Sequence, residues 1–304
     1  MKIVTSGSVY IDIDAYAGII AYAELLQAQA FEAAAVSTAP LNESIPNTVR
    51  SWGAPLQTTY TPSGSDTFIP IDLSDPTFFD PIVTEDRVEE IIDHHTGFES
   101  YWKDKIGDKA HIEFIGAACT LVYERWLHAG LVDAMGQTSA RLLICGILDN
   151  TLNFGAQVST KRDEDAYAAL LPIADLPDDW TAQYFSECQT SILNDVEAAL
   201  KNDTKIPTFA TFGQAVCLGQ LTVWDAQALE QYRTAIAKTL SDIKPEWFLN
   251  LISVSERKSY FVSNNADVQA WLARFLDVEF DGDIAAANRL WLRKEIIKYD
   301  SEAA

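Results

Sequence analysis

Three of the strands predicted for the first half of the chain are followed by acidic residues. These strands cover residues 2–6, 68–71 and 88–92, and the polar residues at or beyond their carboxyl ends are Asp12, Asp14, Asp72, Asp93, His94 and His95. Ligands of open α/β sheets bind beyond the carboxyl ends of the strands, so we expect these side chains to meet at one edge. Carboxylates and imidazoles suit a divalent ion such as Mn²⁺, Mg²⁺ or Co²⁺. The spacing therefore predicts a metal site.

Each of these residues also has an interpretation that needs no metal. Asp12 and Asp14 are suited to cap the helix that follows them. Asp72 is suited to a turn, and adjacent histidines can simply pack together. The metal interpretation is favoured because these alternatives would all have to converge on one sheet edge by accident. The absence of cysteine ligands argues against a structural zinc site.

The order of predicted elements indicates an α/β fold. In the first half, strands alternate with helices, which is typical of a parallel sheet covered by helices. The expected strands are 2–6, 33–37, 68–71, 88–92 and 111–114, and the expected helices are about 16–30, 117–128 and 138–148. The second half has strand candidates at 215–223 and 259–262 around a helix. We expect a catalytic domain at 1–188, a linker at 189–207 and a smaller α/β domain at 208–304, with the active site in the cleft between the domains.

Composition excludes several classes of protein. Of the 304 residues, 48% are hydrophobic and 22% are charged, which is typical of a folded globular chain. A net charge of −22 argues against a nucleic-acid partner, because such binding requires a basic surface. No apolar run approaches the length of about 18 residues that marks a membrane span. The four cysteines are scattered, without a CxxC pair, and the first residues do not form a signal peptide; together these features predict a cytoplasmic protein with reduced thiols.

The same residues resemble the motifs of the DHH phosphoesterase family. The third and most specific motif is Asp93-His94-His95 itself. The other similar stretches are residues 7–14, which end in Asp-x-Asp, the lone Asp72 after a buried strand, and residues 146–154 with 160–163. The resemblance extends over most of the chain.

The C-terminal half narrows the resemblance to one subgroup. It lacks the Gly-Gly-Gly-His motif of relatives that act on RNA or cyclic dinucleotides. Instead, Leu292-Arg293-Lys294-Glu295 is similar to the Ser-Arg-Lys-Lys segment of manganese-dependent, family II inorganic pyrophosphatases and exopolyphosphatases. Asp203-Thr204-Lys205 resembles their phosphate-binding Asp-x-Lys. A solvated terminal segment and a surface linker are the structural alternatives for these cations.

The resemblance implies a mechanism with two metal ions. Asp72 would bridge them, with Asp12 on one side and Asp14 and His94 on the other. Asp93 would orient a histidine, and His95 would contact the phosphoryl group or protonate the leaving oxygen. The implied cofactor is Mn²⁺, with Mg²⁺ or Co²⁺ as alternatives. Arg293, Lys294 and Lys205 would neutralise the phosphate.

The chain departs from the resemblance at two metal-binding positions. The family's pyrophosphatases have His where this chain has Ser8, and Asp where it has Asn150. Serine is a poor replacement ligand, and Asn150 offers a neutral carbonyl oxygen. Asp149, the preceding residue, could supply the missing charge, so both residues are candidate ligands.

These observations predict a metal-dependent hydrolase of pyrophosphate or short polyphosphate. One alternative is a phosphoesterase that acts on a nucleotide or another organic phosphate. A second, motivated by Ser8 and Asn150, is a degenerate member that binds a phosphate ligand without turnover. The expected partner is a small phosphate compound, with neither nucleic acid nor membrane; the resemblance is compatible with a monomer or a homodimer.

Overall fold

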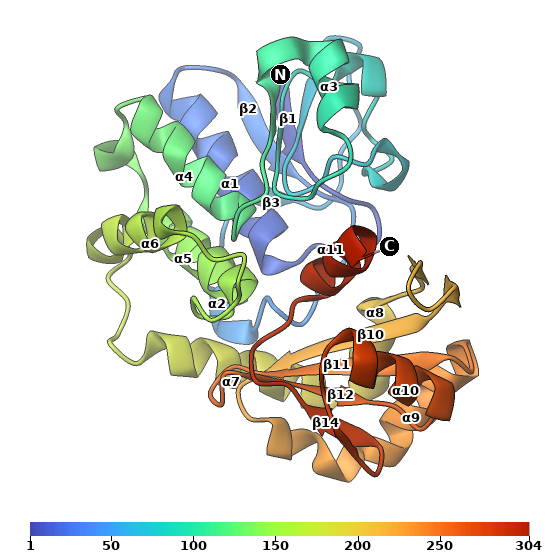
Figure 1. Ribbon diagram of the computed structural model, residues 1–304. Helices are drawn as coiled ribbons and strands as arrows, with labels where there is room; N and C mark the ends of the chain where they lie inside the picture. The colour runs from blue at the N-terminus through green and yellow to red at the C-terminus, as the bar shows by residue number, and fades with distance from the viewer. Residues whose placement is uncertain (304) are drawn as a thin grey trace. The chain divides into compact units, whose positions relative to one another are not determined.

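The computed structural model describes residues 1–303, which form two compact units (Figure 1). Unit 1 comprises residues 1–154 and 158–180, and unit 2 comprises 155–157 and the chain from 181 onward. The predicted linker, 189–207, includes the end of α7 (Trp180–Asn194), α8 (Val196–Asn202) and β7 (Thr204–Lys205), and it lies in unit 2. Within residues 1–303, no helix combines the length and apolar character needed to cross a membrane.

Unit 1 contains the parallel sheet that the alternation of strands and helices predicts. Its order is β3-β2-β1-β4, and β5 and β6 form a further parallel pair. Single parallel bridges, Phe68 to Val88 and Ile71 to Ile92, connect β4 to the chain leading through β5. The strands are β1 (Lys2–Thr5), β2 (Ala33–Val36), β3 (Leu56–Gln57), β4 (Thr67–Pro70), β5 (Ile91–Asp93) and β6 (Ala110–Ile112).

Helices cover this sheet on both faces (Figure 1). The helix α1 contacts β1, β2, α4 and α5, and it is therefore buried on nearly all sides, as an apolar helix inside a domain should be. On the opposite face, Trp102 of α3 packs against Ile3, Phe68 and Ile91. The helices of unit 1 are α1 (Ile13–Ala28), α2 (Asn47–Ser51), α3 (Glu99–Ile106), α4 (Ala118–His128), α5 (Gln137–Thr151) and α6 (Lys161–Ala174).

Glu89 joins several elements of unit 1 and makes its stability depend on pH. Its carboxylate accepts hydrogen bonds from Lys2 of β1, Thr67 of β4 and Lys109. Burial alone would raise its pKa, but these donors outweigh burial and lower the pKa of Glu89 from 4.5 to about 2. A lowered carboxyl pKa stabilises the fold above the unfolded-state value, and this contribution is lost as the pH falls from about 4.5 to about 2.

We expect Glu89→Gln to lower the free energy of unfolding by about 1 kcal/mol at neutral pH, because the ion pairs are partly solvated. The difference from wild type should shrink as the pH falls below about 4.5. Urea unfolding followed by tryptophan fluorescence between neutral pH and pH about 3 measures it. The exposed Glu32→Gln serves as control. A difference that is constant across this pH range would contradict the prediction.

Unit 2 has a separate, mixed sheet. Its order is β13-β14-β12-β11-β10-β7; β10 and β11 are parallel and the other pairs are antiparallel. A small hairpin, β8 (Thr208–Phe209) with β9 (Gln214–Ala215), stands beside it. The remaining elements are β10 (Cys217–Val223), α9 (Arg233–Ile243), β11 (Trp247–Ser253), β12 (Lys258–Val262), α10 (Ala266–Phe275), β13 (Phe280–Asp281), β14 (Ile284–Ala286) and α11 (Arg293–Ala303).

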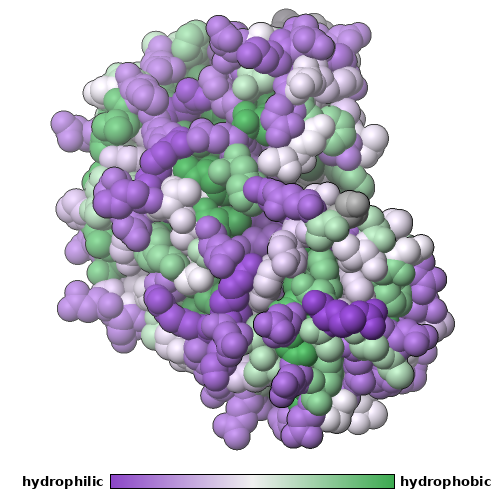
Figure 2. Space-filling view, in the orientation of Figure 1, coloured by the Kyte–Doolittle hydropathy of each residue, from purple (hydrophilic) through white to green (hydrophobic). Residues whose placement is uncertain are grey.

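The central strand β11 separates two hydrophobic cores. Trp247, Leu249 and Leu251 belong to the core that includes residues of α8 and α9. Phe248, between them, belongs to the core that includes residues of α10 and α11. Because both faces are covered, every residue of β11 is buried. In the space-filling view, hydrophilic side chains cover much of the visible surface of each unit, as the net charge of −22 leads one to expect (Figure 2).

Candidate metal centre

Asp12 and Asp14 lie at the start of α1. Asp12 is the N-cap, and one of its carboxylate oxygens accepts a hydrogen bond from the Ala15 amide at 3.0 Å. Asp14 is fully buried. Its two carboxylate oxygens accept hydrogen bonds from the backbone amides of Ala118 and Cys119, each at 2.8 Å. The capping interpretation is thus correct for Asp12. Asp14 instead joins the first turn of α1 to the first turn of α4.

Asp72 occupies a sharp turn just after β4. Its φ angle is 61°, in the left-handed region that few residues other than glycine, Asn and Asp adopt. Its amide donates to the carbonyl of Ile92 at 2.8 Å, which joins this turn to β5. The side chain is only 6% exposed, so the turn places a carboxylate inside the protein at the carboxyl edge of the sheet.

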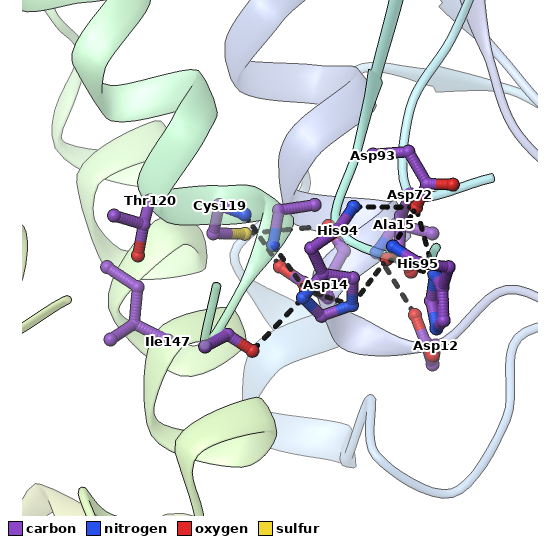
Figure 3. Close-up of polar contacts among 12 residues, drawn as sticks. Asp12, Asp14, Ala15, Asp72, Asp93, His94, His95, Cys119, Thr120 and Ile147 are labelled. Carbon is purple, nitrogen blue, oxygen red and sulfur yellow. Dashed lines mark hydrogen bonds and ion pairs between the residues drawn. The ribbon is translucent and has the colours of Figure 1, made fainter. Parts of the chain in front are cut away.

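His94 is fully buried and faces two carboxylates (Figure 3). Its Nε2 lies 3.1 Å from Asp72 Oδ1 and 3.7 Å from Asp14 Oδ2. Its Nδ1 lies 3.0 Å from the carbonyl oxygen of Gly116. A carbonyl can only accept, so Nδ1 carries a proton and Nε2 is the nitrogen directed at the two carboxylates.

Asp93 holds the second histidine. Its Oδ1 accepts hydrogen bonds from the backbone amides of His94 and His95, and it lies 2.9 Å from His95 Nδ1. Burial alone would raise the pKa of Asp93, but the charge and hydrogen bonds of His95, with a hydrogen bond from Ser74, outweigh it and lower that pKa. The His95 side chain is 48% exposed, so Asp93 fixes a ring that solvent reaches.

The electrostatics of the cluster depend on burial. Burial is the main cause that raises the pKa of Asp14 to about 6, and the nearby charge of Asp12 adds to it, although the bonds from Cys119 and Ala118 oppose the rise. Burial also raises the pKa of the Cys119 thiol well above its usual value, and the Asp14 charge contributes. A thiol that stays protonated is a poor metal ligand, so the donor set consists of oxygen and nitrogen atoms.

This arrangement fits a divalent cation. Ligand atoms of Asp72, His94 and His95 lie within 4.8 Å of one another, and Asp14 lies beyond His94 on the buried side. A lone pair on His94 Nε2 would repel the carboxylates of Asp72 and Asp14 unless a proton or a cation lay among them. The nitrogen and oxygen donors suit Mn²⁺, and the hydrogen bond from Nδ1 to Gly116 is the outer support that metal-binding histidines usually have.

Asp149 and Asn150 lie near the end of α5 and are half-buried. Their position relative to Asp14 follows from Gly146, one turn earlier. A Cβ atom on Gly146 would lie 3.1 Å from Asp14 Oδ1 and 2.4 Å from Cys119 Sγ. Residues three and four apart share a helix face, so both candidates lie on the face that packs toward Asp14. Which of the two would bind metal stays a prediction.

We expect Gly146→Ala to lower the free energy of unfolding by about 1–3 kcal/mol, because the added methyl group overlaps Cys119 Sγ in a buried contact. Cys119→Ala removes that sulfur atom and should restore part of the stability in the double variant. A double-mutant cycle from urea unfolding measures the coupling. Additive losses would show that Cys119 is not the obstructing group.

Ser8 lies on the loop between β1 and α1. Its hydroxyl donates to the carbonyl of Phe78 at 3.2 Å, and its amide donates to the same oxygen at 2.9 Å. The hydroxyl is therefore bonded to the main chain.

The predicted phosphate-binding residues lie in unit 2. Arg293 is the first residue of α11, and its amide donates to Gln220 of β10 at 2.8 Å. Its guanidinium donates to the Asp203 carbonyl at 2.7 Å and lies 2.6 Å from the Asp203 carboxylate. Lys205, two residues after Asp203, ends β7 and is exposed, and Lys294 follows Arg293. The structure therefore brings Arg293 to the Asp203–Lys205 segment.

Sequence reasoning missed the main-chain groups of the cluster. The Gly116 carbonyl and the Ala118 and Cys119 amides contact His94 and Asp14 directly, yet main-chain groups leave no mark in residue types. The only sequence signal for these main-chain contacts was Gly116, a glycine just before the helix α4.

Fold and site define a two-unit α/β protein with a cluster of carboxylates and imidazoles at the edge of a parallel sheet. No protein-family model matches the chain. The chain is similar in sequence to two proteins described as probable manganese-dependent inorganic pyrophosphatases, and in fold to a family II inorganic pyrophosphatase and an exopolyphosphatase-related protein.

Two curated relatives match in sequence. The chain is 30% identical over 176 residues to the "Probable manganese-dependent inorganic pyrophosphatase" of Deinococcus radiodurans, which covers 55% of this chain and 52% of the relative. It is 23% identical over 151 residues to the protein of the same description from Clostridium acetobutylicum, covering 47% of this chain and 45% of the relative. The chain thus spans about half the length of these relatives.

Two solved structures share the fold. The "putative family II inorganic pyrophosphatase" of Methanococcus jannaschii aligns with a TM-score of 0.74 over 100% of this chain and 99% of its own, at 17% identity. An exopolyphosphatase-related protein from Bacteroides fragilis aligns with a TM-score of 0.53 over 99% and 91%, at 13% identity. At these identities the similarity establishes the fold.

Proposed function

We propose that this protein is a manganese-dependent hydrolase of a phosphoanhydride, with pyrophosphate or short polyphosphate as substrate. The observation that carries the proposal is the His94 ring, whose Nδ1 is fixed by the Gly116 carbonyl while Nε2 lies 3.1 Å from Asp72 Oδ1. The matches to pyrophosphatases in sequence support the same chemistry.

We infer that Asp12, Asp14, Asp72 and His94 would hold two divalent ions, and that Asp149 or Asn150 would complete the set of ligands. When bound, divalent ions stabilise charge on the phosphoryl oxygens and activate water for attack. The buried carboxylates of Asp72 and Asp14 give the cluster the negative charge that holds such cations. Mn²⁺ is the expected metal, since the sequence relatives carry manganese in their descriptions.

His95 acts on the substrate side of the cluster. The Asp93 carboxylate accepts a hydrogen bond from His95 Nδ1. The other ring nitrogen of His95, Nε2, is therefore directed away from Asp93 and is available to the phosphate. Because the ring is 48% exposed, a phosphoryl oxygen can reach it. His95 would bind that oxygen or donate a proton to the leaving phosphate.

Arg293, Lys294 and Lys205 neutralise the negative charge of the substrate. A planar guanidinium can donate two parallel hydrogen bonds to a phosphate, and Asp203 already holds that of Arg293 in a fixed orientation. The reaction requires these residues of unit 2 and the cluster of unit 1 to meet the same phosphate. This requirement is the basis for our proposal that the active site forms in a cleft between the two domains.

The expected ligand is a small phosphate compound. The net charge of −22 opposes binding of a nucleic acid, so local cations and metal ions would have to attract even a small anion. The oligomeric state, for which the resemblance is compatible with a monomer or a homodimer, stays a prediction.

Phosphate release from a panel of substrates tests the proposed specificity. The panel contains pyrophosphate, tripolyphosphate, long-chain polyphosphate, a nucleoside monophosphate and p-nitrophenyl phosphate, each with Mn²⁺ present. Fastest turnover of pyrophosphate or tripolyphosphate supports the proposal. Preference for a monoester would replace it with a phosphoesterase. Bound phosphate without turnover of any substrate would favour the binding-only function that the Ser8 and Asn150 replacements suggest.

A further inference from the structure

A further buried carboxylate, that of Asp163, lies against Gly116, whose carbonyl contacts His94. It is at the start of α6, in the Thr160–Asp163 segment, and the proposed mechanism does not use it. We propose that Asp163 is a positioning residue for His94, acting through the main chain of Gly116. The consequence for turnover rests on the proposed function, whereas the structural effect on His94 does not.

Asp163 makes more contacts than its helix requires. One oxygen accepts the amide and the hydroxyl of Thr160 at 2.7 and 2.8 Å, as expected of an acidic residue in the first turn. The other oxygen accepts the hydroxyl of Thr120, on α4, at 2.6 Å. The Asp163 and Thr120 side chains are fully buried. Helix capping explains the Thr160 contacts, but not the bond to α4.

The same carboxylate lies directly against Gly116. A Cβ atom on Gly116 would lie only 2.5, 2.7 and 2.8 Å from Asp163 Oδ2, Cγ and Oδ1. Any side chain at residue 116 would therefore displace the carboxylate or the main chain. Gly116 is required here because the Asp163 carboxylate occupies the space that a side chain would take.

Two carboxylates thus hold the segment from Gly116 to Thr120. Asp14 accepts hydrogen bonds from the amides of Ala118 and Cys119. Asp163 packs on Gly116 and accepts a hydrogen bond from the hydroxyl of Thr120. In the same segment, the Gly116 carbonyl oxygen accepts a hydrogen bond from His94 Nδ1, with 3.0 Å between the two atoms. The position of this carbonyl decides which nitrogen of His94 presents its lone pair to Asp72 and Asp14.

Removing Asp163 should therefore release the Gly116 carbonyl and change the tautomer of His94. In metal-free Asp163→Ala, long-range ¹⁵N–¹H correlation spectra of the imidazoles should show a loss of the single Nδ1–H form, with His94→Gln used for assignment. Manganese binding, titrated with Mn²⁺ alone, should weaken by about tenfold or more. Both measurements are independent of hydrolysis, so they remain informative even if no substrate is turned over.

The matched control is Asp195→Ala, which removes another helix-capping carboxylate, one that accepts the Ala198 amide at 2.9 Å in unit 2. It should leave the His94 tautomer and the Mn²⁺ affinity unchanged. Folded Asp163→Ala with a wild-type tautomer and affinity would overturn the proposal. If that variant does not fold, Thr120→Val and Thr120→Ser decide: loss of the tautomer in the first and retention in the second support it, and identical spectra refute it.

Discussion

Asp72→Asn should abolish manganese-dependent phosphate release from pyrophosphate, lowering the rate by about 10³-fold. The variant keeps the shape of the side chain but replaces a charged ligand with a neutral amide beside His94 Nε2, which lies 3.1 Å from Asp72 Oδ1. The backbone should tolerate the change, because Asn adopts the left-handed conformation of residue 72, with its φ of 61°, as readily as Asp does. Activity and Mn²⁺ affinity should therefore fall while the fold is retained.

Asp75→Asn is the matched control for this variant. Asp75 lies three residues further along, caps a short helical turn by accepting the Thr77 amide at 2.9 Å, and is not part of the cluster. Its replacement should change the rate by less than about twofold. Turnover by Asp72→Asn at the wild-type rate would show that Asp72 does not hold the catalytic metal.

The second large effect is expected from Arg293→Lys, which should lower kcat/KM for pyrophosphate by about 10²-fold. Lysine keeps the charge but loses the planar pair of donors, and it cannot keep both contacts of the guanidinium with Asp203. Mn²⁺ affinity should not change, because the proposed ligands all belong to unit 1. Steady-state kinetics together with a Mn²⁺ titration separates these two effects.

Arg274→Lys, at an exposed position of α10, controls for a general effect of replacing Arg in unit 2. It should behave as wild type. If Arg293→Lys retained full kcat/KM, Arg293 would be a structural partner of Asp203 rather than a substrate-binding residue.

The parallel sheet of unit 1 was predictable because its pattern is local. Short apolar strands alternate with helices, and the predicted helix at 117–128 agrees with α4, Ala118–His128. The helix α1 begins three residues earlier than the predicted start at about residue 16, because Asp12 is its N-cap, one of the two interpretations of that residue. The strand β11 was missed because it is buried on both faces, so its sequence, apolar apart from Asn250 and Ser253, lacks the alternation that marks a half-buried strand.

The candidate site was predictable only where side chains carry the information. The order Asp72, Asp93, His94 and His95 at strand ends was visible, and the structure places them together. The supports of His94 come from distant segments: the Gly116 carbonyl is 22 residues away, and Thr120 and Asp163 are 43 residues apart. Such contacts follow from how α4 and α6 pack, which a single sequence does not reveal.

The central claim is that a divalent ion held at Asp72 and His94 makes this protein a phosphoanhydride hydrolase. The most direct measurement is phosphate release from pyrophosphate by protein stripped with a chelator, before and after titration with Mn²⁺. We predict no release from stripped protein and a rate that rises with Mn²⁺ until the cluster is saturated, with no such rise in Asp72→Asn. Equal release with and without chelator, or no release at saturating Mn²⁺, would contradict the claim.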